Sequence, residues 1–230
     1  DSYSIYWTSF TTRLYNYAMV GKSLGVITGN TWERDDNGNI IFHELSASQK
    51  ALYGGEYVPT YNQNTLDELG NFHPDFTGGF NTSISFKNFR LSANIDFSVG
   101  GQIVSYTNMW GSSSGILDKT AELNDRGVNV REPVSKGGGI HMTGVDQDGN
   151  KVDTYVNAKL YYTTASRVWE EWVYDRTYVK LREVSLSYVF PSQTLKKLNI
   201  GLSRASVAIN ASNPVSYTHL RAHETEADLV

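Results

Sequence analysis

Two runs of alternating residues meet at a two-residue turn between Phe80 and Val99, and this feature constrains the fold more than any other. The second run places an apolar residue at every odd position: Phe89, Leu91, Ala93, Ile95, Phe97 and Val99. The first run, from Phe80 to Phe86, alternates in a similar way with polar residues between its apolar ones. Successive side chains of a strand point to opposite faces, so a period of two predicts a β-hairpin with one apolar and one polar face. Lys87-Asn88 is its expected turn.

The alternation by itself leaves open what covers the apolar face. In a β-sandwich a second sheet packs there. In a membrane β-barrel lipid lies there, and the polar residues face a lumen.

Composition narrows the classes of function. The formal net charge is −4 and the lysines and arginines are scattered, so the chain offers no basic surface for nucleic acid. It contains no cysteine, which excludes a disulfide framework and a thiolate zinc site. No apolar run approaches the roughly 18 residues of a helical membrane span, whereas barrel strands need only about 10 alternating residues.

Four further stretches have the composition of strands, namely 4–20, 24–32, 178–190 and 200–210. In 178–190 the apolar residues change parity after Leu181, which predicts a β-bulge near Arg182-Glu183. Pro191 should end that strand, and residues 192–198 read as a short polar link. About six strands are therefore expected in the chain.

The connections between these strands alternate in length. They are short at 20–23, 87–88 and 191–198, and they are long from about 33 to 71 and from about 107 to 174. Long loops without periodicity are uncommon inside compact domains. Short turns on one side and long loops on the other are the layout of outer-membrane barrels. We therefore expect an open, curved antiparallel sheet with disordered long loops.

Four blocks of the sequence resemble SusC/RagA-type TonB-linked outer membrane proteins, in the order in which they occur in that family. The most recognisable is YDRTYVKLREVSLSYVFP at 174–191. The others are VGKSLGVITG at 20–29, ELGNFHPDFTGGFNTSISFKNFRLS at 68–92 and NIGLSRASVAINASNP at 199–214. Four blocks in order make a more specific signal than any one alone.

The resemblance implies an all-β fold in which antiparallel strands form part of a large transmembrane β-barrel with long extracellular loops. Residues 1–214 would be a partial TonB-dependent receptor barrel, incomplete here because a barrel of that class has roughly 22 strands. The resemblance also implies transport across the cell outer membrane of glycan oligomers or peptides, without cofactor or enzymatic activity. Implied partners are membrane lipid, a SusD-like surface lipoprotein, and the TonB complex acting through an amino-terminal region outside this chain.

The last segment departs from the family pattern. Residues 215–230, VSYTHLRAHETEADLV, show no strand alternation and resemble translated sequencing-adapter text. We expect residues 215–230 to be a non-native tail, and we expect His219 and His223, four residues apart within it, not to bind a metal.

Three tryptophans in the second long connection are candidates for binding a substrate: Trp110, Trp169 and Trp172. Trp110 is the preferred one because it lies deep in a long loop. Other aromatic residues near expected strand ends are assigned to the girdle at the lipid headgroups. These are Trp7, Trp32, Tyr106 and Tyr178.

Carboxylates that suggest other chemistry have simpler explanations. Glu170 and Glu171 are adjacent, whereas a glycosidase needs two carboxylates facing each other across about 5–9 Å. We interpret them as loop packing or as a docking contact for a lid partner, and expect no catalytic residue. The acidic runs at 35–38 and 146–149 resemble the start of a calcium loop but lack its glutamate at the twelfth position. We predict hairpin turns there, and an isolated Ca²⁺ on such a rim loop stays an open alternative.

The alternative function is a secreted all-β carbohydrate-binding module that uses Trp110, Trp169 and Trp172. It predicts a soluble product. The transporter interpretation predicts instead that the isolated chain aggregates through its sheet edges and apolar face.

Overall fold

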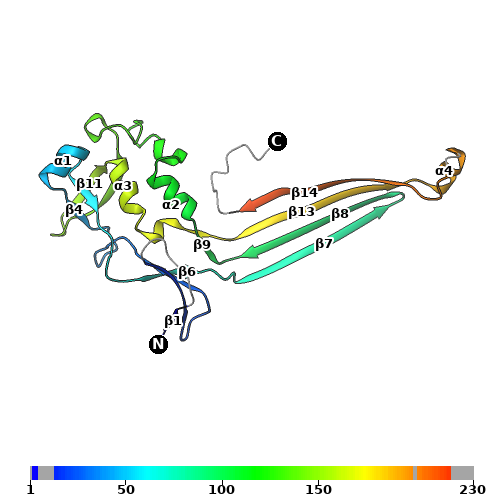
Figure 1. The fold of residues 1–230 in the computed structure, drawn as a ribbon, viewed down its shortest axis with the longest axis horizontal. Coiled ribbons are helices and arrows are strands. Elements are labelled where there is room, and N and C mark those ends of the chain that lie inside the picture. Colours follow the sequence, from blue (N-terminus) through cyan, green and yellow to red (C-terminus); the bar gives the residue numbers. More distant parts are fainter. Residues whose placement is uncertain (1, 5–12, 199–200, 219–230) are drawn as a thin grey trace. The chain divides into compact units, whose positions relative to one another are not determined.

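The computed structural model describes residues 2–4, 13–198 and 201–218, and the chain divides into two compact units (Figure 1). The sheet unit comprises His73–Gln102 and Asp175–Val230, and the loop unit comprises Asp1–Phe72 and Ile103–Tyr174. The chain therefore leaves each unit and returns to it.

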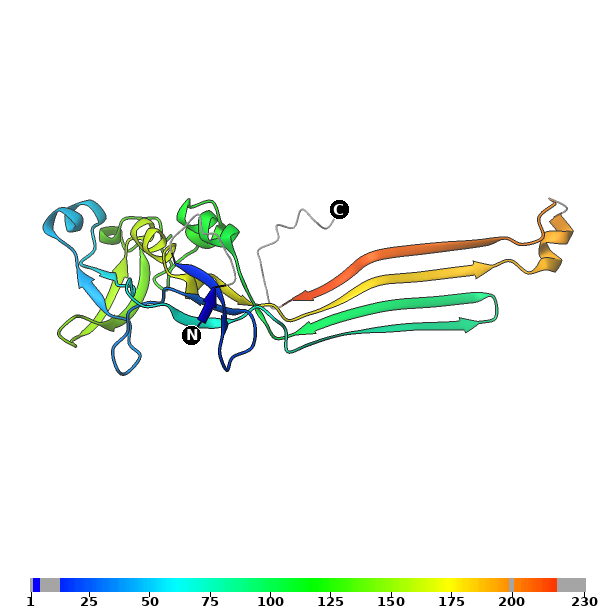
Figure 2. The ribbon, with the colours of Figure 1, turned by 60° about the horizontal axis from the view of Figure 1, so that its bottom comes forward.

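The sheet unit is built on four long antiparallel strands in the order β14-β13-β8-β7. Figures 1 and 2 show them side by side as one gently curved layer. They are β7 (Phe76–Phe86), β8 (Phe89–Val99), β13 (Tyr178–Val189) and β14 (Ser206–Thr218). The predicted hairpin is confirmed, because Phe86 pairs with Phe89 and Lys87 turns the chain with a φ of 53°.

The register of the four strands gathers the apolar side chains on one face. Ile95 of β8 pairs with Phe80 on one side and Leu181 on the other. Further along, Leu91 pairs with Ile84 and Leu186. The same pairing extends this apolar face to β14, and it includes Phe86, Phe89, Ala93, Phe97, Val184, Tyr188, Val207, Ile209, Val215 and Tyr217. Several of these side chains are largely open, with Phe86 69% and Ile209 74% exposed.

The opposite face of the sheet is polar. Its rows run across the strands in register, for example Ser83, Ser92, Ser185 and Asn210. Asn81, Asn94 and Glu183 form the next row toward the loop unit's end of the strands. Hydroxyl, amide and charged groups thus cover one side of the layer whose other side is hydrocarbon.

The predicted bulge in β13 is confirmed at Arg182. Both ladders of β13 shift register between Leu181 and Glu183. Arg182 has no opposite residue in β8, whereas in β14 Asn213 and Pro214 lie between the partners of Leu181 and Glu183. The Arg182 guanidinium donates to both carboxylate oxygens of Asp96, at 2.8 and 2.9 Å. The bulge keeps the apolar side chains of β13 on one face of the sheet, although they occupy odd positions up to Leu181 and even positions from Val184.

A hydrogen bond joins β8 and β13 at the end of the sheet where β8 finishes and β13 begins. The backbone N–H of Gly100 donates to the Thr177 hydroxyl at 2.9 Å. Gly100 has a φ of 74°, and a Cβ there would lie 2.2 Å from a carboxylate oxygen of Asp75. A residue without a side chain is therefore required where β8 ends.

Three expectations about element boundaries are corrected. The link at 192–198 is the helix α4 (Ser192–Leu198) rather than irregular chain. Strand β14 begins at Ser206 rather than at residue 200, and it continues past Pro214 to Thr218. Residues 215–218 are thus part of a strand, with Val215 opposite Leu181 and Tyr217 opposite Val179, although the tail showed no alternation by itself.

The expectation of six strands in one sheet is also corrected, because the amino-terminal ones belong to the loop unit. The stretch 4–20 is not one strand: β1 (Ser2–Ser4) pairs antiparallel with β2 (Leu14–Met19). A four-stranded sheet continues through β3 (Val26–Gly29) to β6 (Asp67–Asn71).

The long connections are ordered rather than disordered, and short elements build them. Three two-stranded sheets pair β4 (Phe42–Glu44) with β5 (Tyr57–Pro59), β10 (Ile140–Val145) with β11 (Lys151–Val156), and β9 (Gln102–Val104) with β12 (Val173–Asp175). The helices are α1 (Ala47–Tyr53), α2 (Tyr106–Ser113) and α3 (Ala158–Ala165), and the 3₁₀ turns are η1 (Asp118–Ala121), η2 (Val134–Lys136) and η3 (Trp169–Trp172).

Local capping explains why such short helices form. Ser46 and Gln49 make a reciprocal capping box at the start of α1, and Gly54 ends that helix with a φ of 71°. The Asn157 side chain accepts hydrogen bonds from the backbone N–H groups of Lys159 and Leu160, in the first turn of α3. Among the described residues no helix is both long and apolar enough to cross a membrane.

The core of the loop unit is rich in tryptophan. Trp32, Trp169 and Trp172 are buried together with Ile27, Met109 and Val168. Trp169 reaches the sheet because Gly29 leaves room, since a Cβ on Gly29 would lie 2.7 Å from the Cβ of Trp169. A smaller cluster of Phe42, Val152 and Val156 packs beside β10 and β11.

Candidate functional site

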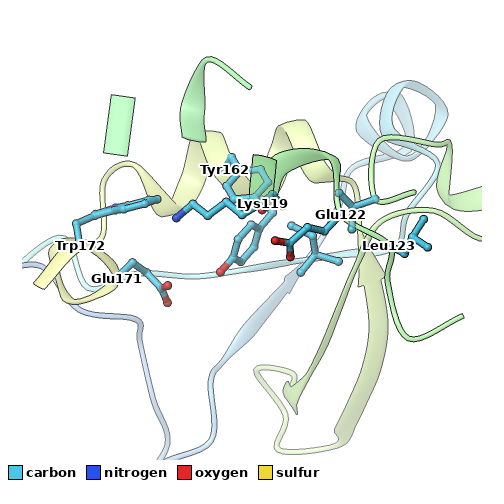
Figure 3. Close-up of a pocket in the computed structure, with 9 residues that line it drawn as sticks. Lys119, Glu122, Leu123, Tyr162, Glu171 and Trp172 are labelled. Carbon is cyan, nitrogen blue, oxygen red and sulfur yellow. Dashed lines mark hydrogen bonds between the residues drawn. The ribbon is translucent and has the colours of Figure 1, made fainter. Parts of the chain in front are cut away.

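A pocket of about 250 Å³ opens in the loop unit, between α3, η1 and η3 (Figure 3). Aromatic residues of α3 and η3 form much of its wall, and polar groups converge on it from η1 and the following residues. Its lining consists of Lys119, Glu122, Leu123, Val130, Ile140, Tyr161, Tyr162, Glu171 and Trp172.

Helix α3 places two tyrosines in this wall. Tyr161 stacks against Trp32 with ring centroids 6.2 Å apart, and it meets Tyr162 edge-on at 5.2 Å. The Tyr162 hydroxyl donates to the backbone carbonyl of Lys119 at 2.9 Å. Burial raises the pKa of Tyr162 to about 12 and raises that of Tyr161 further. Both phenols are therefore neutral hydrogen-bonding groups at physiological pH.

Lys119 extends across the pocket toward Trp172, as Figure 3 shows. Its ammonium nitrogen lies 4.3 Å from the indole centroid, which is a cation–π contact. Burial lowers the pKa of Lys119, and the charges of Glu171 and Glu122 oppose that effect. The pocket thus contains one ammonium and two carboxylates above an aromatic surface.

The adjacent carboxylates Glu170 and Glu171 bind the two N–H groups of one residue. Glu170 accepts from the backbone N–H of Trp32 and pairs with Arg34, whose guanidinium nitrogen lies 3.0 Å away. Glu171 accepts from the indole N–H of Trp32 at 2.5 Å. These contacts show that the pair packs the loop unit, which is one of the two interpretations made from the sequence. Glu171 also lines the pocket.

Arg131 fastens the segment that carries Lys119 and Glu122. Its guanidinium donates to the Thr120 carbonyl at 2.8 Å and to the Thr120 hydroxyl at 2.6 Å, and it also bonds the carbonyl of Gly115. Asn129 donates to the carbonyl of Ala121 at 2.7 Å. Side chain to backbone bonds therefore hold this side of the pocket, where regular secondary structure is sparse.

The three tryptophans named from sequence have different positions. Trp169 is 1% exposed and Trp172 is 2% exposed, so both belong to the core, and Trp172 also lines the pocket. Trp110 lies on α2 and is 52% exposed. The structure brings Trp169 and Trp172 together on η3 and leaves Trp110 outside the pocket lining.

Sequence reasoning missed Lys119, Glu122 and the pocket role of the two tyrosines. The density of aromatic residues around 155–172 was the available signal. Of the residues assigned to a lipid girdle, Trp32 is buried and Tyr106 packs on Trp169 at 5.2 Å, so these two serve the core. Trp7 lies outside the described residues.

The two acidic runs are turns, as predicted. One carboxylate oxygen of Asp35 accepts the N–H groups of Asn37 and Asn39, at 3.0 and 2.7 Å. Asp146 accepts those of Asp148 and Asn150 in the same way, at 3.0 and 2.8 Å. The side-chain amides of Asn39 and Asn150 also donate to these carboxylates, each at 3.0 Å, and these bonds, together with those from the backbone, lower the pKa of Asp35 and Asp146. Within the described ranges no group of His, Asp and Glu side chains has the geometry of a metal site, and His219 and His223 lie outside those ranges.

The fold defines a class: a two-faced antiparallel sheet whose strands are joined by short turns at one end and by an ordered loop unit at the other. No family model matches the chain. A curated relative, TonB-dependent receptor P3 of Formosa agariphila, is 28% identical over 181 residues, which are 76% of this chain and 16% of that receptor.

Solved structures agree in fold. The RagAB peptide importer in its open-open state matches with a TM-score of 0.52 at 15% identity, covering 92% of this chain and 20% of the other. The RagAB peptide transporter matches with a TM-score of 0.50 at 14% identity, covering 94% and 21%. The resemblance to TonB-dependent receptors of the RagA type is confirmed, and the chain spans only a small part of the length of these relatives.

Proposed function

We propose that this chain is part of the barrel wall and outer loops of a TonB-dependent importer in the cell outer membrane. The observation that carries the proposal is the register of β7, β8, β13 and β14, which keeps apolar side chains on one face through four strands and across a bulge. Lipid covers such a face in a barrel, and the polar face lines the lumen.

The cargo under this proposal is an oligomer of amino acids or sugars, and the partners are a SusD-like surface lipoprotein and the TonB complex. The names of the relatives support a receptor and importer role rather than an enzymatic one. The pocket of the loop unit supports contact with a polar cargo, because it combines aromatic walls with one ammonium and two carboxylates. Trp110 is the exposed aromatic side chain that we propose as a second contact.

The lipid assignment can be tested with two neighbouring cysteine substitutions in the complete parent protein. Ala93→Cys and Ser92→Cys change side chains of similar size on opposite faces of β8, and the sequence in hand contains no cysteine to interfere. After labelling with a fluorophore in outer membranes, nitroxide-labelled lipid should quench the probe at position 93 strongly and that at position 92 weakly. A water-soluble quencher should give the reverse order.

Equal quenching at the two positions would contradict the lipid assignment and favour a sheet packed within a soluble protein. The cargo class is tested separately, by deleting the parent gene and comparing uptake of labelled oligopeptides with that of labelled oligosaccharides. Loss of uptake of one class identifies the cargo, and unchanged uptake of both contradicts the importer role.

A further inference from the structure

The pocket between α3, η1 and η3 already holds one ammonium group, which belongs to the protein itself. The Lys119 ammonium nitrogen lies 4.3 Å from the ring centroid of Trp172, and Figure 3 shows it directed at that ring. Lys119 is half-buried, and burial lowers its pKa, while the charges of Glu171 and Glu122 favour its protonated form. An aromatic face with negative charge nearby is the surrounding in which proteins bind ammonium groups.

The two carboxylates of the pocket keep capacity for a further cation. Among the described residues, neither Glu122 nor Glu171 has a cationic nitrogen within 4 Å. The Glu171 carboxylate accepts from the indole N–H of Trp32 at 2.5 Å. A carboxylate has about four sites for accepting hydrogen bonds, so that one bond does not saturate it.

The neighbouring guanidinium groups are committed to other partners. Arg131 donates to the backbone carbonyls of Thr120 and Gly115 and lies outside the pocket lining. Arg34 pairs with Glu170 rather than with Glu171. The side chains that line the pocket therefore carry two negative charges and one positive charge.

The pocket also has room for a second ammonium group. Its volume is about 250 Å³, which is roughly the share of eight water molecules in the liquid. Apolar side chains suited to an alkyl stem line it together with the aromatic ones, namely Leu123, Val130 and Ile140. The Tyr162 hydroxyl donates to the Lys119 carbonyl, which holds this wall in place.

We propose that the pocket binds an alkylammonium group of the cargo, such as the side chain of lysine in a peptide or the amine of an amino sugar. The inference rests on the proposed function and deepens it. The incoming ammonium pairs with Glu122 and Glu171 beside the aromatic wall. Lys119 is a tethered competitor, which occupies the Trp172 end of the pocket when no cargo is bound.

The test uses the complete parent protein, purified in detergent, and two matched pairs of fluorescent probes in mildly acidic buffer. One pair is trilysine and trilysine acetylated on its side chains, and the other is a trimer of glucosamine and the corresponding trimer of N-acetylglucosamine. Acetylation removes the positive charge, so the members of a pair differ in the group under test. At least one charged probe should bind about tenfold more tightly than its acetylated counterpart in microscale thermophoresis.

Three variants locate the binding in this pocket. Lys119→Met removes the tethered ammonium and keeps an unbranched stem, so it should tighten binding of the preferred probe about threefold. Glu122→Gln should weaken that binding about threefold, because it removes one of the two carboxylates. Glu132→Gln removes a carboxylate outside the pocket lining and should leave the affinity unchanged.

Equal binding within both pairs would overturn the proposal, and so would a preference that Glu122→Gln leaves intact. Weaker binding by Lys119→Met would also overturn it, because Lys119 would then be a ligand for an anion rather than a competitor. A preference within one pair supports the proposal and identifies a peptide or an amino sugar as the source of the amine. Recovery of the parent protein from the outer membrane tests the proposed function separately, so a protein found there without an ammonium preference contradicts only this inference.

Discussion

Asn94 and Ile95 are adjacent residues of β8 whose side chains leave the sheet on opposite faces. In the complete parent protein, Ile95→Arg should lower the free energy of unfolding by about 2–4 kcal/mol, because under the proposed function it places a charge in the hydrocarbon near the bilayer midplane. Asn94→Arg should cost much less, since its side chain enters a polar lumen. Denaturant titration in lipid vesicles measures both, and equal costs would count against the lipid-facing assignment.

Tyr162 provides a prediction about pH in the loop unit. Its pKa of about 12 in the folded protein is higher than the ordinary value of 10.0, because burial disfavours the phenolate. The stability that it contributes is therefore complete below pH 10 and is lost as the pH rises toward 12. We expect phenolate absorbance, titrated against pH in the wild type and in Tyr162→Phe, to differ between the two proteins only well above pH 10, where the Tyr162 hydroxyl ionises. A difference centred at pH 10 would contradict the burial of this hydroxyl.

Sequence could identify which residues carry chemistry here but not what they contact. The run Trp169–Trp172 is compatible with a sugar platform or a core, and both tryptophans are in the core because Gly29 and Ala165 leave space for them. The indole N–H of Trp172 donates to the Ala165 carbonyl at 2.8 Å. Contacts between residues so distant along the chain as Gly29 and Trp169 leave no periodic trace in the sequence.

At the scale of the elements, the bulge predicts that two single-residue deletions in β13 differ in their effect on assembly. Deleting Arg182 removes the residue that has no partner in β8 and leaves both halves of β13 in their present register with that strand. We expect assembly of the complete parent protein to persist, because an exposed ion pair such as that of Arg182 with Asp96 contributes little to stability. Deleting Ser185 shifts one half by a residue and turns its apolar side chains to the polar face.

Heat-dependent electrophoretic mobility distinguishes the two deletions. The receptor without Arg182 should migrate as a folded barrel before heating, and the receptor without Ser185 should not. Assembly of both or of neither would show that register in β13 does not depend on the bulge.

Strand β8 was predictable because it repeats one alternating pattern over its eleven residues. The hairpin at Lys87-Asn88 and the bulge at Arg182 follow from parity alone. The loop unit was read as disordered because its elements are short: α1 has seven residues, and β4 and β5 have three each. Caps and distant packing partners stabilise such elements, and periodicity does not report either.

At the scale of the whole molecule, the two units should differ in solubility. The loop unit buries its apolar residues in its own core, whereas the sheet unit exposes an apolar face and two strand edges. We expect the 230-residue chain to aggregate when expressed without detergent. A protein that joins residues 13–72 to 103–174 through a short flexible linker should elute as a soluble monomer in size-exclusion chromatography. A soluble, monomeric complete chain would contradict the barrel assignment.

The hydrogen bond between Gly100 and Thr177 has a consequence for how such proteins diversify. Strands β8 and β13 are neighbours in the sheet although 77 positions separate the two residues that close their common end. Everything between them can be lengthened, shortened or exchanged for another segment without a change in strand register. Variation can therefore accumulate in the inserted segment, while the sheet that carries it is inherited nearly intact.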